Sequence, residues 1–243
     1  MDFFAIISVI LHIFITSKSY NLICNTTRKE QYFFIFYTVI VEFVVEFFFY
    51  SIYLSGLGIE KFLYPFILYA YFIWFKKFDK YRGVFLSFLL SLLYHSTHTF
   101  IAVTLSSITG DELALHYESI FFLVVLLLTY FVILKTIRYF HLEFKYFDKE
   151  YLYSFLKKVL YAFIFLHIVS FISDIVSTIS HLNSFGSILS TIVFICLLLI
   201  FFAMNSYKVQ IEKEIALKQK KFEQKYLQTY TDEIVKLYNE IRG

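Results

Sequence analysis

The sequence predicts an all-α fold, a polytopic membrane bundle of about seven helices (residues 1–206) followed by a parallel dimeric coiled coil (residues 207–243). Three observations predict it. Hydrophobic residues make up 59% of the chain and charged residues 17%, against ~25% charged in soluble domains. Apolar stretches of about 20 residues recur, the length that crosses ~30 Å of hydrocarbon. The last part of the chain is instead dense in Lys, Glu and Gln.

Seven apolar segments are predicted to cross the membrane as helices, because backbone groups in lipid must satisfy their hydrogen bonds internally. They are residues 3–23, 32–54, 59–75, 84–107, 119–136, 158–180 and 186–206. The first lacks the basic region and cleavage site of a signal peptide, so we interpret it as a span and not as a removed leader. Cys24 and Cys196 follow no metal or redox spacing and are expected to be small buried residues.

The distribution of Lys and Arg predicts the orientation of the spans, because cytoplasmic loops carry an excess of them. With the N-terminus outside and the C-terminus in the cytoplasm, only Lys61 of the 22 Lys and Arg residues lies outside. We therefore predict a multi-pass protein of the cell membrane. The aromatic and cationic segment 138–158 is expected to lie along the inner membrane surface.

Two carboxylates interrupt the second apolar segment, VIVEFVVEFFF. Glu42 and Glu46 are one helical turn apart and share a face. A charged residue near the middle of the bilayer costs ~2.5–3.5 kcal/mol, so such residues usually face a cavity or a partner. The same depth argument places His12, His95 and His167 near mid-membrane.

These polar residues predict a cavity within the bundle that opens outward. His95 and His98 share a face of one span, and His167 shares a face of another with Asp174. Three carboxylates without Lys or Arg favour a cationic ligand. The alternative is that Glu and His pair with each other as contacts between helices. The candidate ligand-binding residues are Glu42, Glu46, His95, His98, His167 and Asp174, with the outer-loop acids Asp111, Glu112 and Glu118.

Catalysis and metal binding are not expected in this chain. A zinc-protease helix needs His-Glu-x-x-His, whereas His95-Ser96-Thr97-His98 has the wrong spacing and no Glu. A small-molecule or ion transporter with a cytoplasmic coiled-coil tail is the alternative function, since intramembrane carboxylates are typical of transporters too. The absence of an internal repeat and the single Pro disfavour it. A purely structural dimerising scaffold is a third class.

Apolar residues in the tail recur at mostly four- and three-residue steps, close to a heptad pattern with one stutter. This predicts a homodimer through the C-terminal helix; a single solvated helix is the alternative. The small residues Ser184, Ser187 and Thr191 are candidates for close packing between copies in the membrane. The tail positions are Ile211, Ile215, Phe222, Tyr226, Tyr230, Ile234, Leu237 and Ile241.

Several stretches resemble one family, the ComD-type competence-pheromone receptor histidine kinases of Gram-positive bacteria. They are GLGIEKFLYPF, SLLYHSTHTF, LHIVSFISDIVSTISHLNSFGSIL, FFAMNSYKVQIEKEIALKQKKFEQK and YTDEIVKLYNEIRG. The resemblance implies a sensor that binds a secreted cationic peptide pheromone and controls competence by quorum sensing. It also implies a histidine kinase domain after Gly243, which would use ATP and Mg²⁺ and would pass its phosphoryl group to a response regulator.

The phosphoacceptor motif and the ATP domain are absent from this chain, so no cofactor is expected within it. The expected partners are the peptide, a second copy and membrane lipid, with no nucleic acid.

Overall fold

The computed structural model describes residues 3–51, 59–109, 118–140, 142, 153–180 and 183–243. Within these ranges the chain is helical apart from short turns, which confirms the all-α prediction there. The helices are α1 (Phe3–Cys24), α2 (Arg28–Ser51), α3 (Ile59–Trp74), α4 (Lys80–Thr109), α6 (Glu118–Tyr139), α7 (Tyr153–Ser180) and α8 (Asn183–Arg242). Each predicted span overlaps one of these helices, although 186–206 is only the first part of α8 and residues 52–54 lie outside the described residues. About half of the predicted surface segment 138–158 also lies outside them.

Three of the described helical stretches are long and apolar enough to cross a membrane: Lys80–Thr109, Ile120–Tyr139 and the apolar part of Ile188–Arg242. Val9–Cys24 and Phe62–Trp74 are shorter apolar helices. These features suit a membrane protein. The count of seven spans and their orientation stay predictions.

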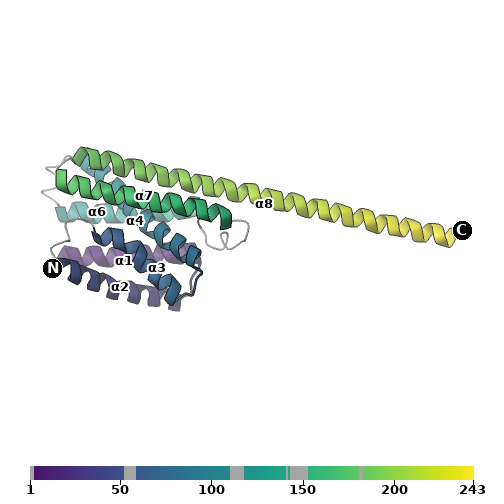
Figure 1. Cartoon of the computed structure of the whole chain (residues 1–243), viewed down its shortest axis with the longest axis horizontal. Coiled ribbons are helices and arrows are strands. Elements are labelled where there is room, and N and C mark those ends of the chain that lie inside the picture. Colours follow the sequence, from purple (N-terminus) through teal and green to yellow (C-terminus); the bar gives the residue numbers. More distant parts are fainter. Residues whose placement is uncertain (1–2, 52–58, 110–117, 141, 143–152, 181–182) are drawn as a thin grey trace. The chain divides into compact units, whose positions relative to one another are not determined.

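The chain divides into two compact units, Met1–Phe201 and Phe202–Gly243. Figure 1 shows the helices of the first unit lying alongside one another. In this unit α4 packs against α1, α3, α6 and α7. Residues 85–94 of α4 are all buried, so this part of the helix is enclosed on every side.

Small residues on α4 permit this close packing. Ser87 and Ser91 are fully buried. A Cβ added at Gly83 would lie 3.0 Å from Cδ1 of Ile73 and 3.4 Å from the ring of Tyr69, so α3 approaches the α4 backbone there. Small residues allow such approach between apolar helices, where van der Waals packing drives association.

An aromatic cluster joins α1, α2 and α3 near one end of the bundle. Tyr20, Phe34, Tyr71 and Phe72 are all fully buried. The ring centroids of Tyr20 and Phe34 are 4.6 Å apart, and those of Phe34 and Tyr71 are 5.0 Å apart. Aromatic pairs of this kind contribute ~0.5–1.5 kcal/mol beyond the area that they bury.

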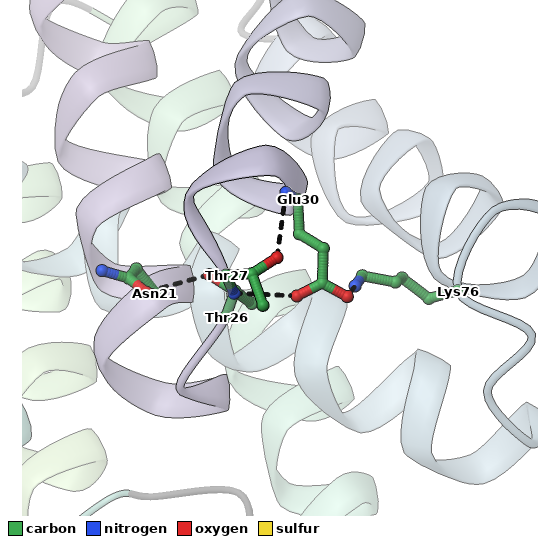
Figure 2. Close-up of polar contacts among 5 residues, drawn as sticks. All are labelled: Asn21, Thr26, Thr27, Glu30 and Lys76. Carbon is green, nitrogen blue, oxygen red and sulfur yellow. Dashed lines mark hydrogen bonds and ion pairs between the residues drawn. The ribbon is translucent and has the colours of Figure 1, made fainter.

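The turn between α1 and α2 is fixed by local hydrogen bonds. Asn25 ends α1 in the left-handed conformation with φ 50°, which Asn tolerates. Thr27 and Glu30 then form a capping box at the start of α2 (Figure 2). The Thr27 backbone N–H donates to Oε2 of Glu30 at 2.9 Å, and the Glu30 N–H donates to Oγ1 of Thr27 at 3.4 Å.

The other Glu30 oxygen, Oε1, accepts a hydrogen bond from Nζ of Lys76, which follows α3 (Figure 2). The α1–α2 and α3–α4 turns are therefore joined at one end of the bundle. In the α3–α4 turn, Asp79 caps the N-terminus of α4. Its Oδ1 accepts hydrogen bonds from the backbone N–H groups of Tyr81 and Arg82 at 3.0 and 3.1 Å. The bond from Lys76, and next that from the Thr27 backbone, hold the pKa of Glu30 below its usual value.

The second unit consists of the remainder of α8 and Gly243. Every residue from Ala216 onward is exposed, including large apolar side chains such as Phe222 (72%) and Ile241 (86%). A single copy of the chain thus leaves the apolar positions of the tail uncovered. The coiled coil itself stays a prediction.

We predict that Glu30→Gln lowers the free energy of unfolding in detergent by about 0.2–1 kcal/mol at neutral pH, the range for a half-exposed ion pair. Gln preserves the capping box and removes only the charge. Because the folded pKa of Glu30 is depressed, its contribution is present above the unfolded value of about 4.3 and disappears as pH falls through the lower folded pKa.

The difference between wild type and Glu30→Gln should therefore shrink at acid pH. Lys76→Met should lower the free energy of unfolding as much as the double variant Glu30→Gln, Lys76→Met does, since both remove the same ion pair. Additive losses in this cycle would contradict the assignment.

Candidate functional site

A cluster of histidine and tyrosine side chains lies inside the first unit, where α1, α3 and α4 meet. α4 supplies Tyr94, His95 and His98, which helical spacing places on adjacent faces. α1 supplies His12, and α3 supplies Tyr64. We refer to these five residues as the His–Tyr cluster.

His12 lies at the centre of the His–Tyr cluster. Its ring stacks on Tyr94 with centroids 4.0 Å apart and planes tilted by 23°, and it lies 4.9 Å from the ring of Tyr64. The ring of His95 is 6.0 Å from that of His12. Tyr64 also meets His95 edge-on at 5.6 Å. The cluster is thus built by contacts between three helices.

Two further contacts connect the His–Tyr cluster to its surroundings. His98 is parallel to Tyr94 at 5.7 Å and meets Phe122 of α6 edge-on at 5.7 Å. The hydroxyl of Tyr64 donates to Oγ1 of Thr16 at 3.4 Å, a long hydrogen bond. Tyr64 and Tyr94 are buried, with 5% and 7% of their surface exposed.

The chemistry of this arrangement follows from its charge. Two imidazolium rings 6.0 Å apart would repel by about 3 kcal/mol at an effective dielectric constant near ~20, so charging His12 opposes charging His95. The faces of Tyr64 and Tyr94 are negative and attract a single cation beside them. The contacts described are those of aromatic packing between three helices, and by themselves they assign no charge to the cluster.

A metal site would need several ligand side chains placed close together. Among the residues that the structure describes, no group of three or more His, Cys, Asp or Glu is placed to hold a metal ion.

His95 and His98 both lie in α4 and each contacts Tyr94, whereas His167 has different neighbours. His167 is 4% exposed, and its Nε2 lies 3.2 Å from the carbonyl oxygen of Phe62. Its ring packs on those of Phe62 and Phe88, at 5.7 and 5.3 Å. Phe62 and Tyr64 are two residues apart on α3 and so lie on different faces. His167 therefore connects α7 to α3 and α4 outside the His–Tyr cluster, beside the ring contacts of Phe171 with Phe62 and of Phe163 with Phe85.

The predicted carboxylates are described only as backbone or not at all. Residues 42 and 46 both lie in α2, so the helical spacing between them holds, and Asp174 and Glu118 lie in α7 and α6. The side chains of these four acids are outside the described residues. Asp111 and Glu112 are outside them altogether. Their share in ligand binding stays a prediction.

Sequence reasoning missed Tyr64 and Tyr94 as members of the site, and it noted the depth of His12 without including it among the candidates. Tyr94 directly precedes His95, which was a usable signal. The chain holds 21 Tyr residues, however, and their packing partners depend on how the helices are arranged. The histidine rings pack between helices, whereas the alternative of Glu–His pairing involves acid side chains outside the described residues and stays a prediction.

The fold is that of an α-helical protein with helices apolar enough to cross a membrane. Comparison with protein-family models, with curated proteins and with solved structures found no significant match.

We predict that Tyr94→Ala lowers the free energy of unfolding in detergent by about 3–5 kcal/mol, because it removes a buried ring that contacts three histidines. Tyr94→Phe keeps the ring and should cost less than about 1.5 kcal/mol. Tyr161→Ala is the matched control, since that ring is 72% exposed. Equal losses for Tyr94→Ala and Tyr161→Ala would contradict the role of the cluster.

Proposed function

We propose that this chain is the membrane sensor part of a ComD-type peptide-pheromone receptor histidine kinase. The observation that carries the proposal is α8, a single helix from Asn183 to Arg242. Its first part is apolar enough to cross a membrane, and its last part is charged and exposed. A helix of this composition suits a protein that links a membrane event to a cytoplasmic domain. The resemblance of the sequence to this family supports the same function.

In this proposal the chain crosses the cell membrane seven times, with the N-terminus outside and the C-terminus in the cytoplasm. The distribution of Lys and Arg supports the orientation. α8 is then the last span, and the tail lies in the cytoplasm, where it forms a parallel homodimer. The exposed apolar side chains of the tail support this pairing.

The proposed ligand is a secreted, cationic and amphipathic peptide that binds from the outside. Basic groups of the peptide would meet Glu42, Glu46 and Asp174, with the outer-loop acids steering its approach. The aromatic residues of the bundle offer surface for the apolar face of the peptide. Phosphorylation, ATP, Mg²⁺ and the response regulator belong to the kinase domain that the family carries after this part.

Binding of a fluorescently labelled synthetic competence peptide to the purified protein tests the proposal. Wild type should bind, and Glu42→Gln, Glu46→Gln or Asp174→Asn should each weaken binding by about 1.5–3 kcal/mol, the value of a hydrogen bond to a charged group. Glu30→Gln is the control, because its carboxylate is paired with Lys76 in the α1–α2 turn.

If wild type binds the peptide and none of the three substitutions weakens binding, the acids are not part of the peptide-binding site. Absence of peptide binding, together with flux of a small molecule or an ion into proteoliposomes, would replace the receptor by a transporter.

A further inference from the structure

The α1–α2 and α3–α4 turns lie at the same end of the first unit. The ion pair between Glu30 and Lys76 joins them, and Figure 2 shows these two side chains meeting between the turns. We refer to the segments 26–32 and 74–82 together as the turn surface. Because both segments belong to one compact unit, their side chains form a single surface.

The two acids of the turn surface already have cationic partners within the protein. Glu30 pairs with Lys76, and its other oxygen accepts from the backbone N–H of Thr27. Oδ2 of Asp79 lies 2.8 Å from Nε of Arg82, and its Oδ1 accepts from backbone N–H groups at the start of α4. The negative charge of both turns is thus taken up by these contacts.

Further cations of the turn surface have no acidic partner among the described residues. The α1–α2 turn supplies two of them and the α3–α4 turn supplies the other two, and all are exposed. They are Arg28, Lys29, Lys77 and Lys80. The turn surface therefore carries an excess of positive charge that is available to an external anion.

One of these cations lies in a strained backbone. Lys77 has φ 52°, in the left-handed region that Gly adopts freely and that a residue with a Cβ adopts at a steric cost. Such strain persists only where the surrounding structure imposes it, and it often marks functional positions. Here it keeps an exposed Lys beside the ion-paired Lys76, where a Gly would fit the backbone better.

Exposed aromatic side chains border the cations. Trp74 ends α3 with 73% of its surface exposed, and Tyr32 near the start of α2 is 70% exposed. Tyr81 in the first turn of α4 is 47% exposed, and Nζ of Lys157 in α7 lies 4.8 Å from the centroid of its ring. Trp and Tyr are enriched at membrane–water interfaces, where their amphipathic rings lie at the level of the headgroups.

The aromatic border selects among the anions that the charge alone would suit. An acidic protein segment would satisfy the cations as well as a lipid phosphate does. An exposed Trp74 beside the half-exposed Phe75, at the end of an apolar helix, suits instead the boundary between hydrocarbon and headgroups. Clusters of Lys and Arg directly beside a membrane span attract anionic lipids. A phospholipid headgroup therefore fits both features of the turn surface.

We propose that the turn surface is a binding site for the headgroups of anionic phospholipids. Arg28 and Lys29 from one turn and Lys77 and Lys80 from the other meet the phosphate groups, and Trp74 lies against the upper part of the acyl chains. The inference rests on the membrane insertion of the proposed function and not on its peptide. The Glu30–Lys76 pair fixes the site, because it keeps the two turns together.

Trp74 supplies the measurement, because it is the single Trp of the chain and directly precedes the cations of the second turn. The intact chain, without peptide, is reconstituted in phosphatidylcholine bilayers that contain a small fraction of a lipid brominated near the headgroup end of its acyl chains. Bromine quenches Trp fluorescence on contact. Brominated phosphatidylglycerol should quench Trp74 severalfold more strongly than the same fraction of brominated phosphatidylcholine. The preference should fall as salt is raised, since salt screens exposed charges.

Substitution of the cations tests which residues hold the lipid. The combined variant should quench equally with both lipids, because it keeps Trp74 and removes the charge; it contains Arg28→Gln, Lys29→Gln, Lys77→Gln and Lys80→Gln. The matched control removes the same number of exposed cations from the tail and should keep the preference; it contains Lys213→Gln, Lys218→Gln, Lys220→Gln and Lys221→Gln. Far-UV circular dichroism confirms that each variant is helical.

Equal quenching by the two brominated lipids in wild type would overturn the proposal, as it would if another part of the chain or an acidic partner covered the turn surface. A preference that the combined variant retains, or that the tail control loses, would overturn the assignment to these cations. Because no peptide is present, a chain that prefers phosphatidylglycerol but fails to bind the competence peptide would refute the receptor function and leave the lipid site intact.

Discussion

Close packing around α4 is the constraint on which the rest of the first unit depends. Four helices contact it, and its segment 85–94 is buried all round. Gly83, Ser87 and Ser91 are small enough for neighbouring helices to approach its backbone. One turn further on, the same helix directs Tyr94, His95 and His98 toward α1 and toward α6. The His–Tyr cluster is therefore positioned by the most enclosed helix of the fold.

The sequence could predict the helices because each apolar run is long and backbone groups without water need internal partners. It could also predict that His95 and His98 lie on one face, since that follows from a three-residue spacing. It could not predict that His12 stacks on Tyr94 or that His167 packs with Phe62, because these contacts depend on the rotation of separate helices about their axes.

The α1–α2 and α3–α4 turns carry local sequence signals. Thr27 and Glu30 have the spacing of a capping box, and Asp79 precedes a helix, so both turns could have been read from the residues alone. The ion pair of Glu30 with Lys76 could not be predicted from the sequence, because 46 positions separate its partners and the chain holds several other Lys residues.

The described helices differ in how far their apolar side chains are covered. Within the first unit, buried rings and small residues hold the helices together. On α8, apolar residues remain uncovered in both the apolar and the charged parts.

Distance measurement between spin labels on the tails of two copies in lipid nanodiscs tests the proposed signalling through α8 most directly. A label at Asp232→Cys, in a chain whose native cysteines are replaced by Ser, reports the separation of the two tails. Adding a synthetic cationic competence peptide at saturating concentration should change the distance distribution. Peptide that binds and leaves the distribution unchanged would contradict a sensor that signals through α8.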